Sequence, residues 1–172
     1  MLVLSPIFKI MKVLFCFLLV CSFASAQQIA APCKEVPALN QAIVDALKPY
    51  IGKKIARGEC WDAAELALNK VGADWDGLYV FGREIDITKE CIQPGDIVQF
   101  EEVEMEVKTE NGGYSESFYH HTAIVYKVNG PGDLQFIHQN TGQYGRKMGV
   151  TDFNLANKTK GKMTFYRPVK KA

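Results

Sequence analysis

Residues 58–72 read GECWDAAELALNKVG, and this stretch determines how the rest of the chain is interpreted. Apolar side chains recur in it at helical spacing, and Gly72 provides a helix stop. The repeating positions are Trp61, Ala64, Leu68 and Val71. The pattern therefore predicts a helix that begins at Cys60 and carries a thiol at its N-terminus.

A thiol at a helix start is suited to nucleophilic chemistry. The unpaired N–H groups and the dipole of the helix N-terminus stabilise a thiolate, so we expect the pKa of Cys60 to lie below its ordinary value of about 8.5. Such a nucleophile needs a general base, usually a histidine held in the right tautomer by a third polar group. The chain has only three histidines, His120, His121 and His138.

The segments around this helix predict helices first and strands afterwards. Pro37 opens an apolar helical pattern that Pro49 kinks or ends. After the Cys60 helix, turn signals separate segments with strand character, at 96–100, 102–108, 117–128, 134–140 and 162–168. This order indicates an α+β fold in which N-terminal helices pack on an antiparallel sheet of about five strands.

Two of the histidines are adjacent, so only one can face the thiol. Neighbouring residues of a strand point to opposite faces. His121 shares its face with Ala123 and Val125, small and branched residues that suit packing under a helix. We therefore predict His121 as the base. On the next strand His138 and Asn140 share a face, and periodicity does not decide which of them orients His121.

Four segments carry a resemblance to known families. GECWDAAELAL, QPGDIVQF, HTAIV and IHQN occur in the order and approximate spacing of the CHAP amidohydrolase/peptidase and NlpC-type cell-wall peptidase families. The resemblance spans roughly residues 43–168 and implies a papain-like fold. It also implies Cys60 as nucleophile, Gly95 with Asp96 as the turn that opens the sheet, and His121 as base. The GECW segment and the doubled histidine resemble even more closely the cysteine-proteinase-like domain that ends certain fungal actin-patch scaffold proteins.

The two families imply different partners for His121. The CHAP arrangement places the third catalytic residue on Asn140, whereas NlpC-type relatives use a histidine, which falls on His138. We expect Asn140 to be the orienting residue, because its separation from His121 matches the CHAP arrangement. An amide can also accept the imidazole N–H without itself titrating near neutral pH.

The N-terminus has the features of a secretory signal peptide. Lys9 and Lys12 precede the apolar run VLFCFLLVCSF and a small-residue cleavage site that ends at Ala26. Translation from Met1 or from Met11 would give the same product. We predict a signal peptide at residues 1–26 and a single domain at residues 27–172, exported to a periplasmic or extracellular space, with no stable membrane span in the mature chain.

The cysteine count agrees with export. Loss of Cys16 and Cys21 with the signal leaves three cysteines. In an oxidising compartment two of them should pair and one should stay free. Cys33 and Cys91 are the expected pair because Cys60 lies at the helix start, and Cys60 is then the free thiol.

Composition and spacing argue against other classes of function. The 20 basic and 19 acidic residues nearly balance, which gives no reason to expect nucleic acid as a partner. Cys60 and the histidines lack the paired spacing of a zinc site. No glycine-rich segment opens a helix after a strand, so we expect no metal, nucleotide or other cofactor.

These observations predict a cysteine hydrolase that cleaves a peptide or amide bond. The family resemblance implies peptidoglycan as a possible substrate, although no cell-wall-binding repeat accompanies the domain. The alternative is a catalytically silent papain-like domain that binds a protein or peptide. A redox enzyme is disfavoured because the sequence has no C-x-x-C motif.

Overall fold

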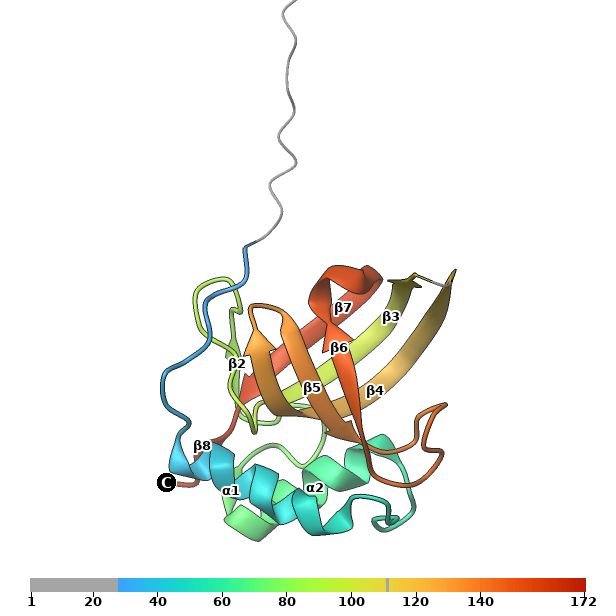
Figure 1. Cartoon of the computed structure of the whole chain (residues 1–172). Helices are drawn as coiled ribbons and strands as arrows, with labels where there is room; N and C mark the ends of the chain where they lie inside the picture. Colours follow the sequence, from blue (N-terminus) through green and yellow to red (C-terminus); the bar gives the residue numbers. More distant parts are fainter. Residues whose placement is uncertain (1–27, 111) are drawn as a thin grey trace, which may run out of the picture.

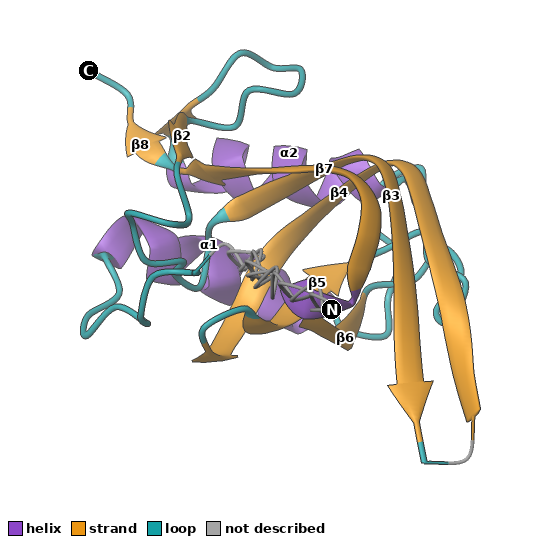
Figure 2. Cartoon of the chain, turned by 90° about the horizontal axis from the view of Figure 1, so that it is seen from above, coloured by secondary structure: helices purple, strands orange, loops and turns teal. Residues whose placement is uncertain are grey.

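The structure is a computed structural model that describes residues 28–110 and 112–172, so the predicted signal peptide at 1–26 lies outside the described residues. Figure 1 shows two helices beneath a curved antiparallel sheet, and Figure 2 shows the same arrangement from above. The elements are α1 (Ala38–Leu47), η1 (Lys48–Tyr50), α2 (Cys60–Val71), β1 (Ala73–Asp74), β2 (Arg83–Ile85), β3 (Ile97–Thr109), β4 (Gly112–Gly130), β5 (Asp133–His138), β6 (Gly149–Asn154), η2 (Leu155–Asn157), β7 (Lys158–Arg167) and β8 (Val169–Lys170).

Both predicted helices form. Helix α1 ends at Leu47, and the 3-10 turn η1 follows it, with Pro49 at a position that needs no backbone N–H. Helix α2 begins at Cys60 and ends at Gly72, whose φ of 65° is the left-handed conformation of a helix C-terminus. The prediction that Cys60 heads a helix is therefore confirmed.

The main sheet has six strands in the order β2-β7-β3-β4-β5-β6, with every neighbouring pair antiparallel. The two strands predicted at 96–100 and 102–108 are one continuous strand, β3. A bulge interrupts its pairing with β7 between Glu101 and Glu104, and Glu102 there has a φ of 50°. The predicted alternation past the bulge is present, with Val103 and Met105 buried and Glu104 and Glu106 exposed.

Two strands of this sheet were not expected. Strand β6 lies between the strands predicted at 134–140 and 162–168, where only a connection was expected. Strand β2 lies before the first predicted strand, in a segment whose form was not predicted. The short β1 and β8 pair in a separate two-stranded sheet. The α+β class is confirmed, with six strands in the main sheet instead of about five.

The sheet has an apolar core on each face. The helix-side core joins α1 and α2 to sheet residues such as Ile97, Ile124 and Ile137. The second core is rich in aromatic rings from the opposite face. Phe100 of β3 contacts Phe153 of β6 at 5.7 Å between ring centroids, although β4 and β5 lie between these strands in the sheet. The sheet is therefore strongly curved around this second core.

A disulfide and a buried ion pair tie the ends of the fold together. Cys33 and Cys91 form the predicted disulfide, and Cys60 is the free cysteine of the described chain. The fully buried Asp96 accepts a hydrogen bond from the side-chain amide of Asn40 of α1 and forms an ion pair with Arg167 at the end of β7. This explains the Pro-Gly-Asp turn, because Asp96 joins α1 to the start of β3 and the end of β7.

Candidate functional site

The loop before Cys60 is held in a conformation that requires glycine. Gly58 has a φ of 88°, and a Cβ at this position would lie 2.7 Å from the Cβ of Arg146. The buried carboxylate of Asp62, in the first turn of α2, accepts the backbone N–H groups of Gly58 and Glu59 at 3.0 Å each. Asp62 therefore fixes the start of the helix and the position of Cys60.

The end of β5 anchors the same loop. Gln139 is fully buried, and its amide accepts from the Ile55 backbone N–H at 3.1 Å and donates to the Glu59 carbonyl at 2.7 Å. It also donates to the Ile55 carbonyl at 3.1 Å. No role was predicted for Gln139 or Asp62. The capping role of Asp62 could have been predicted, because it is an acidic residue at the third position of the predicted helix. No pattern in the sequence indicates the role of Gln139.

Cys60 lies against strand β4 on the helix side of the sheet. Its side chain is partly buried, and the sulfur accepts a hydrogen bond from the backbone of Thr122. The His121 ring points to the opposite face, where it contacts Phe100 and Phe118 of the aromatic-rich core. The structure therefore does not bring the His121 side chain to the thiol.

His121 makes a buried hydrogen bond with His138. The Nε2 atom of His121 lies 2.9 Å from Nδ1 of His138. Only 5% of His121 and 2% of His138 are exposed. The Nε2 atom of His138 in turn lies 2.8 Å from the hydroxyl oxygen of Thr151 on β6. A line of hydrogen-bonding groups therefore runs from His121 through His138 to Thr151.

Asn140 does not occupy the position expected for it. Strand β5 ends at His138, and Asn140 follows with a left-handed φ of 61°, so the two side chains do not share a strand face. The amide of Asn140 donates to a carboxylate oxygen of Glu59 at 2.9 Å. The geometry therefore favours His138, not Asn140, as the residue that orients His121.

The reason given for choosing His121 over His120 was also wrong. Ala123 and Val125 belong to the aromatic-rich core, whereas the helices pack on the face that carries Ile124. Both faces of β4 carry apolar side chains, so the pattern could not identify the helix side. Strand alternation places His120 with Ile124 on the helix side of the sheet, where His120 pairs with Glu101 at 3.0 Å. The geometry therefore favours His120, not His121, as the histidine on the face of Cys60.

Burial keeps the candidate catalytic groups neutral. It raises the pKa of the Cys60 thiol, and the hydrogen bonds from the backbone of Thr122 and Trp61 offset only part of that rise. The expectation of a lowered thiol pKa is therefore not met. Burial also lowers the pKa of His121 to about 4 and that of His138 to about 3. Near neutral pH Cys60 is thus a thiol, and the buried His121 and His138 are neutral imidazoles.

A short loop of exposed apolar residues flanks the candidate site. The indole N–H of Trp61 donates to the Leu78 carbonyl at 2.5 Å, and Tyr79 packs edge-on against His120 at 4.5 Å between ring centroids. Leu78 is 63% exposed and Tyr79 44% exposed. Because Trp61 follows Cys60, this loop connects the surroundings of Cys60 with His120.

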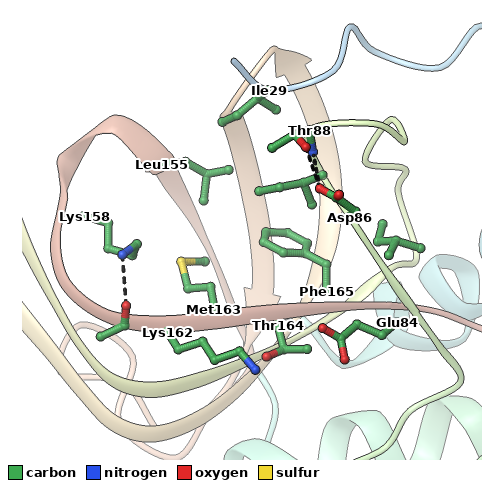
Figure 3. A pocket seen from close by; sticks show the side chains of 13 residues that line it. Ile29, Glu84, Asp86, Thr88, Leu155, Lys158, Lys162, Met163, Thr164 and Phe165 are labelled. Carbon is green, nitrogen blue, oxygen red and sulfur yellow. Dashed lines mark hydrogen bonds between the residues drawn. The ribbon is translucent and has the colours of Figure 1, made fainter. Parts of the chain in front are cut away.

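A cavity of about 780 Å³ lies away from this chemistry, between the segment after β2 and strand β7. Figure 3 shows Met163 and Phe165 in it with Glu84, Asp86 and Lys158 around them. Asp86 and Lys158 are engaged in local hydrogen bonds, to Thr88 and to the Gly161 carbonyl. We assign no function to this cavity.

Residues 28–110 and 112–172 show neither a metal-binding cluster nor a membrane-spanning helix. Within this part of the chain, no group of three or more histidine, cysteine, aspartate or glutamate side chains has the geometry to hold a metal ion. Over the same residues, none of the helices combines the length and apolar character needed to cross a membrane.

Comparison with known proteins identifies a family. Residues 37–172 match the family described as the AIM3/BBC1 Cysteine proteinase-fold domain. No curated protein matches the chain. A solved structure described as "The crystal structure of Ly7917" is similar at 15% identity and a TM-score of 0.48, over 74% of this chain and 62% of that one.

Proposed function

We propose that this chain, which belongs to the AIM3/BBC1 cysteine proteinase-fold family, is an exported cysteine hydrolase that cleaves a peptide or amide bond. Cys60 is the nucleophile, His120 is the base, and Glu101 orients His120. The observation that carries this proposal is the pair of His120 Nδ1 with Glu101 at 3.0 Å, on the face of the sheet that meets the helix-start thiol. A nucleophile, a base and an orienting group are the three parts that such catalysis needs.

The neutral state of the thiol determines the first step. Because burial raises the pKa of Cys60, a free thiolate is scarce near pH 7. His120 therefore takes the thiol proton on Nε2 as the sulfur attacks the amide carbonyl. The Glu101 carboxylate accepts the N–H of His120 Nδ1 and stabilises the imidazolium that forms. The backbone N–H of Cys60 helps to hold the oxyanion.

The second half of the reaction uses the same groups. His120 returns the proton to the leaving amine, which frees the product and leaves an acyl group on Cys60. Water, activated by His120, then hydrolyses this thioester and restores the thiol. The exposed Leu78 and Tyr79 suit a substrate with apolar side chains near the cleaved bond, which favours a peptide over a sugar.

Export is part of the proposal. It is supported by the disulfide between Cys33 and Cys91, a bond typical of oxidising compartments, and by the signal-like pattern of residues 1–26. Intact-mass measurement of the secreted protein should give a chain that begins at Gln27, and thiol titration should find one free sulfhydryl, on Cys60.

The direct test is turnover of a panel of peptide amides that includes peptidoglycan peptides. Cys60→Ala and His120→Ala should each abolish cleavage while the circular dichroism spectrum stays unchanged. The comparison variant is His121→Gln, which removes the neighbouring imidazole on the opposite face of the sheet and should keep most of the activity. An inactive but folded His121→Gln together with an active His120→Ala would refute the assignment of the base.

A second candidate function is peptide binding without turnover. It is favoured by the raised pKa of Cys60, which disfavours a resting nucleophile, and by the exposed apolar loop beside it. A binding module would retain full affinity for its peptide in Cys60→Ala and would show no acyl-enzyme by mass spectrometry with wild type.

A further inference from the structure

Basic side chains gather around the loop that precedes Cys60. They come from residues 53–57 and 146–147, two segments that lie far apart in the sequence. A backbone hydrogen bond of 2.8 Å, from the Met148 N–H to the Lys53 carbonyl, holds the two segments side by side. The exposed residues of this basic cluster are Lys53, Lys54, Arg57, Arg146 and Lys147.

Arg146 reaches the loop directly before the nucleophile. A Cβ on Gly58 would lie 2.7 Å from the Cβ of Arg146 and 3.1 Å from the Cδ of Lys54, so these two side chains pack over Gly58. Arg146 Nη1 donates to the Arg57 carbonyl at 3.2 Å, and its Nη2 lies 3.4 Å from the Glu59 carboxylate. The Arg146 side chain is still 62% exposed, so it is fixed beside the nucleophile and open to solvent.

Arg57 is fixed by a buried carboxylate. Its Nε and Nη2 atoms donate to Asp62 Oδ1 at 3.0 and 2.5 Å. A guanidinium has five N–H groups, so three remain after these two bonds, and the side chain is 66% exposed. The guanidinium carbon lies 5.7 Å from the ring centre of Trp61, whose indole N–H binds the Leu78 carbonyl. The basic cluster and the exposed apolar loop therefore meet at Trp61.

The cluster concentrates positive charge in a chain whose 20 basic and 19 acidic residues nearly balance. Its five basic residues face three acidic neighbours, Asp62, Glu59 and Glu65. Asp62 is fully buried while both guanidinium groups are largely exposed, so an anion that approaches from solvent meets positive charge first.

We propose that Arg57 and Arg146 form a subsite for a carboxylate of the substrate, so that the site takes an acidic peptide. This inference rests on the proposed function of the same site. Guanidinium groups bind carboxylates through paired, charge-assisted hydrogen bonds. Because Arg57 contacts Trp61 and Arg146 contacts Glu59, the residues on either side of the nucleophile, the bound carboxylate lies close to the cleaved amide. The preferred substrate carries an acidic residue beside that bond and an apolar residue that reaches Leu78.

Binding to Cys60→Ala tests the subsite without turnover. The probes are fluorescein-labelled hexapeptides with one leucine and one glutamate, in which the glutamate is moved along the peptide. Each probe has a twin with glutamine in place of glutamate. By fluorescence anisotropy the best glutamate peptide should bind about fivefold more tightly than its twin, and added salt should reduce this difference.

Substitutions in the same background assign the preference to the two arginines. Arg57→Gln and Arg146→Gln should each weaken binding of the glutamate peptide and leave the glutamine twin unchanged. Equal weakening of both twins would show a structural role and overturn the inference. Arg146→Gln removes only an exposed ion pair with Glu59, so it keeps the test available if Arg57→Gln, which loses its contacts with Asp62, fails to fold. The matched control is Lys70→Gln, an exposed lysine in the last turn of α2, which should keep the full preference.

The outcomes separate this inference from the proposed function. A glutamate preference that Arg146→Gln reduces supports the inference even if wild type cleaves no peptide, in which case the hydrolase proposal alone fails. Cleavage by wild type with no preference for glutamate at any position, or an undiminished preference in Arg146→Gln, would overturn the inference and leave the hydrolase proposal intact.

Discussion

Two buried polar clusters, one around Asp96 and the other around His121 and His138, satisfy their hydrogen-bonding groups in different ways. The Asp96 carboxylate accepts from the Asn40 amide, from the Gln93 backbone N–H and from two nitrogens of Arg167. It is a charged group that several elements surround with donors. The histidine pair is connected in a single line, with neutral partners throughout.

This difference indicates what each cluster does. Burial raises the pKa of Asp96, and the guanidinium of Arg167 opposes that rise, so the charge is compensated inside the protein. Among the described residues no acidic side chain compensates the histidine pair in this way, and burial lowers both histidine pKa values. The Asp96 cluster therefore contributes a fixed charge to the fold, whereas the histidine pair contributes only while both rings stay neutral.

The largest expected effect comes from breaking the charged cluster. Asp96→Ala should lower the free energy of unfolding by about 3–5 kcal/mol, because it leaves the guanidinium of Arg167 without its buried counterion. Denaturant unfolding followed by circular dichroism measures this loss. The control is Glu104→Gln, which removes an exposed ion pair with Lys160 and should cost less than about 1 kcal/mol. Equal losses in the two variants would mean that Asp96 is not the structural centre proposed for it.

Removing Glu101 should affect the reaction more than the fold. Glu101→Ala takes away the acceptor that holds the N–H of His120 Nδ1, so we expect kcat/KM to fall by about 100-fold or more, which corresponds to about 2.7 kcal/mol. Steady-state kinetics with the best amide of the panel measures it. Glu101→Gln keeps an acceptor and should recover part of the loss, whereas a Glu101→Ala variant as active as wild type would remove Glu101 from the site.

The sequence predicted these two clusters unequally. Helical spacing was enough to place Cys60 at a helix start, and the odd number of cysteines was enough to pair Cys33 with Cys91. Strand periodicity correctly separated His120 from His121 but could not say which face meets a helix. The reason is that the sheet has a core on both faces, so Ala123 and Ile124 are equally buried.

The remaining contacts of the site could not be predicted, because they depend on where the strands end. Asn140 was expected on a strand face, but β5 stops at His138 and the chain turns. Strand β6 was missed because its six residues include polar side chains and lie among glycines. The contact between Thr151 and His138 could not be predicted without β6, because it depends on the pairing of β5 with β6.

The pH dependence of stability provides a third, smaller effect. Because the folded pKa values of His121 and His138 lie below the ordinary value of about 6.5, the unfolded chain binds protons first. Stability is therefore complete above about pH 6.5 and falls as the pH drops toward about 4 for His121 and about 3 for His138. Each histidine contributes up to about 1.4 kcal/mol per pH unit.

This slope distinguishes the histidine pair from the carboxylates. Unfolding free energies measured between pH 7 and pH 5 lie above the range in which most carboxylates titrate. His138→Gln should reduce the slope in this window, because one of the two buried imidazoles is gone. An unchanged slope in His138→Gln would mean that His138 is not buried in a neutral form.

The smallest effect is expected at Asn140, which belongs to neither of the two clusters. Its amide donates to Glu59, the residue before Cys60, and its backbone has a left-handed φ of 61°. Asn140→Ala should lower the free energy of unfolding by about 1–2 kcal/mol, because alanine tolerates this backbone conformation poorly and cannot replace the hydrogen bond. Asn140→Gly accepts the conformation easily and isolates the loss of the hydrogen bond, so it should cost less. Since Asn140 contacts the loop before the nucleophile and not the base, kcat/KM should change less than about tenfold in either variant, far less than in Glu101→Ala. The same denaturant unfolding and steady-state kinetics measure both quantities. A rate loss in Asn140→Gly as large as that of Glu101→Ala would give the orienting role to Asn140, as the CHAP-type resemblance first implied.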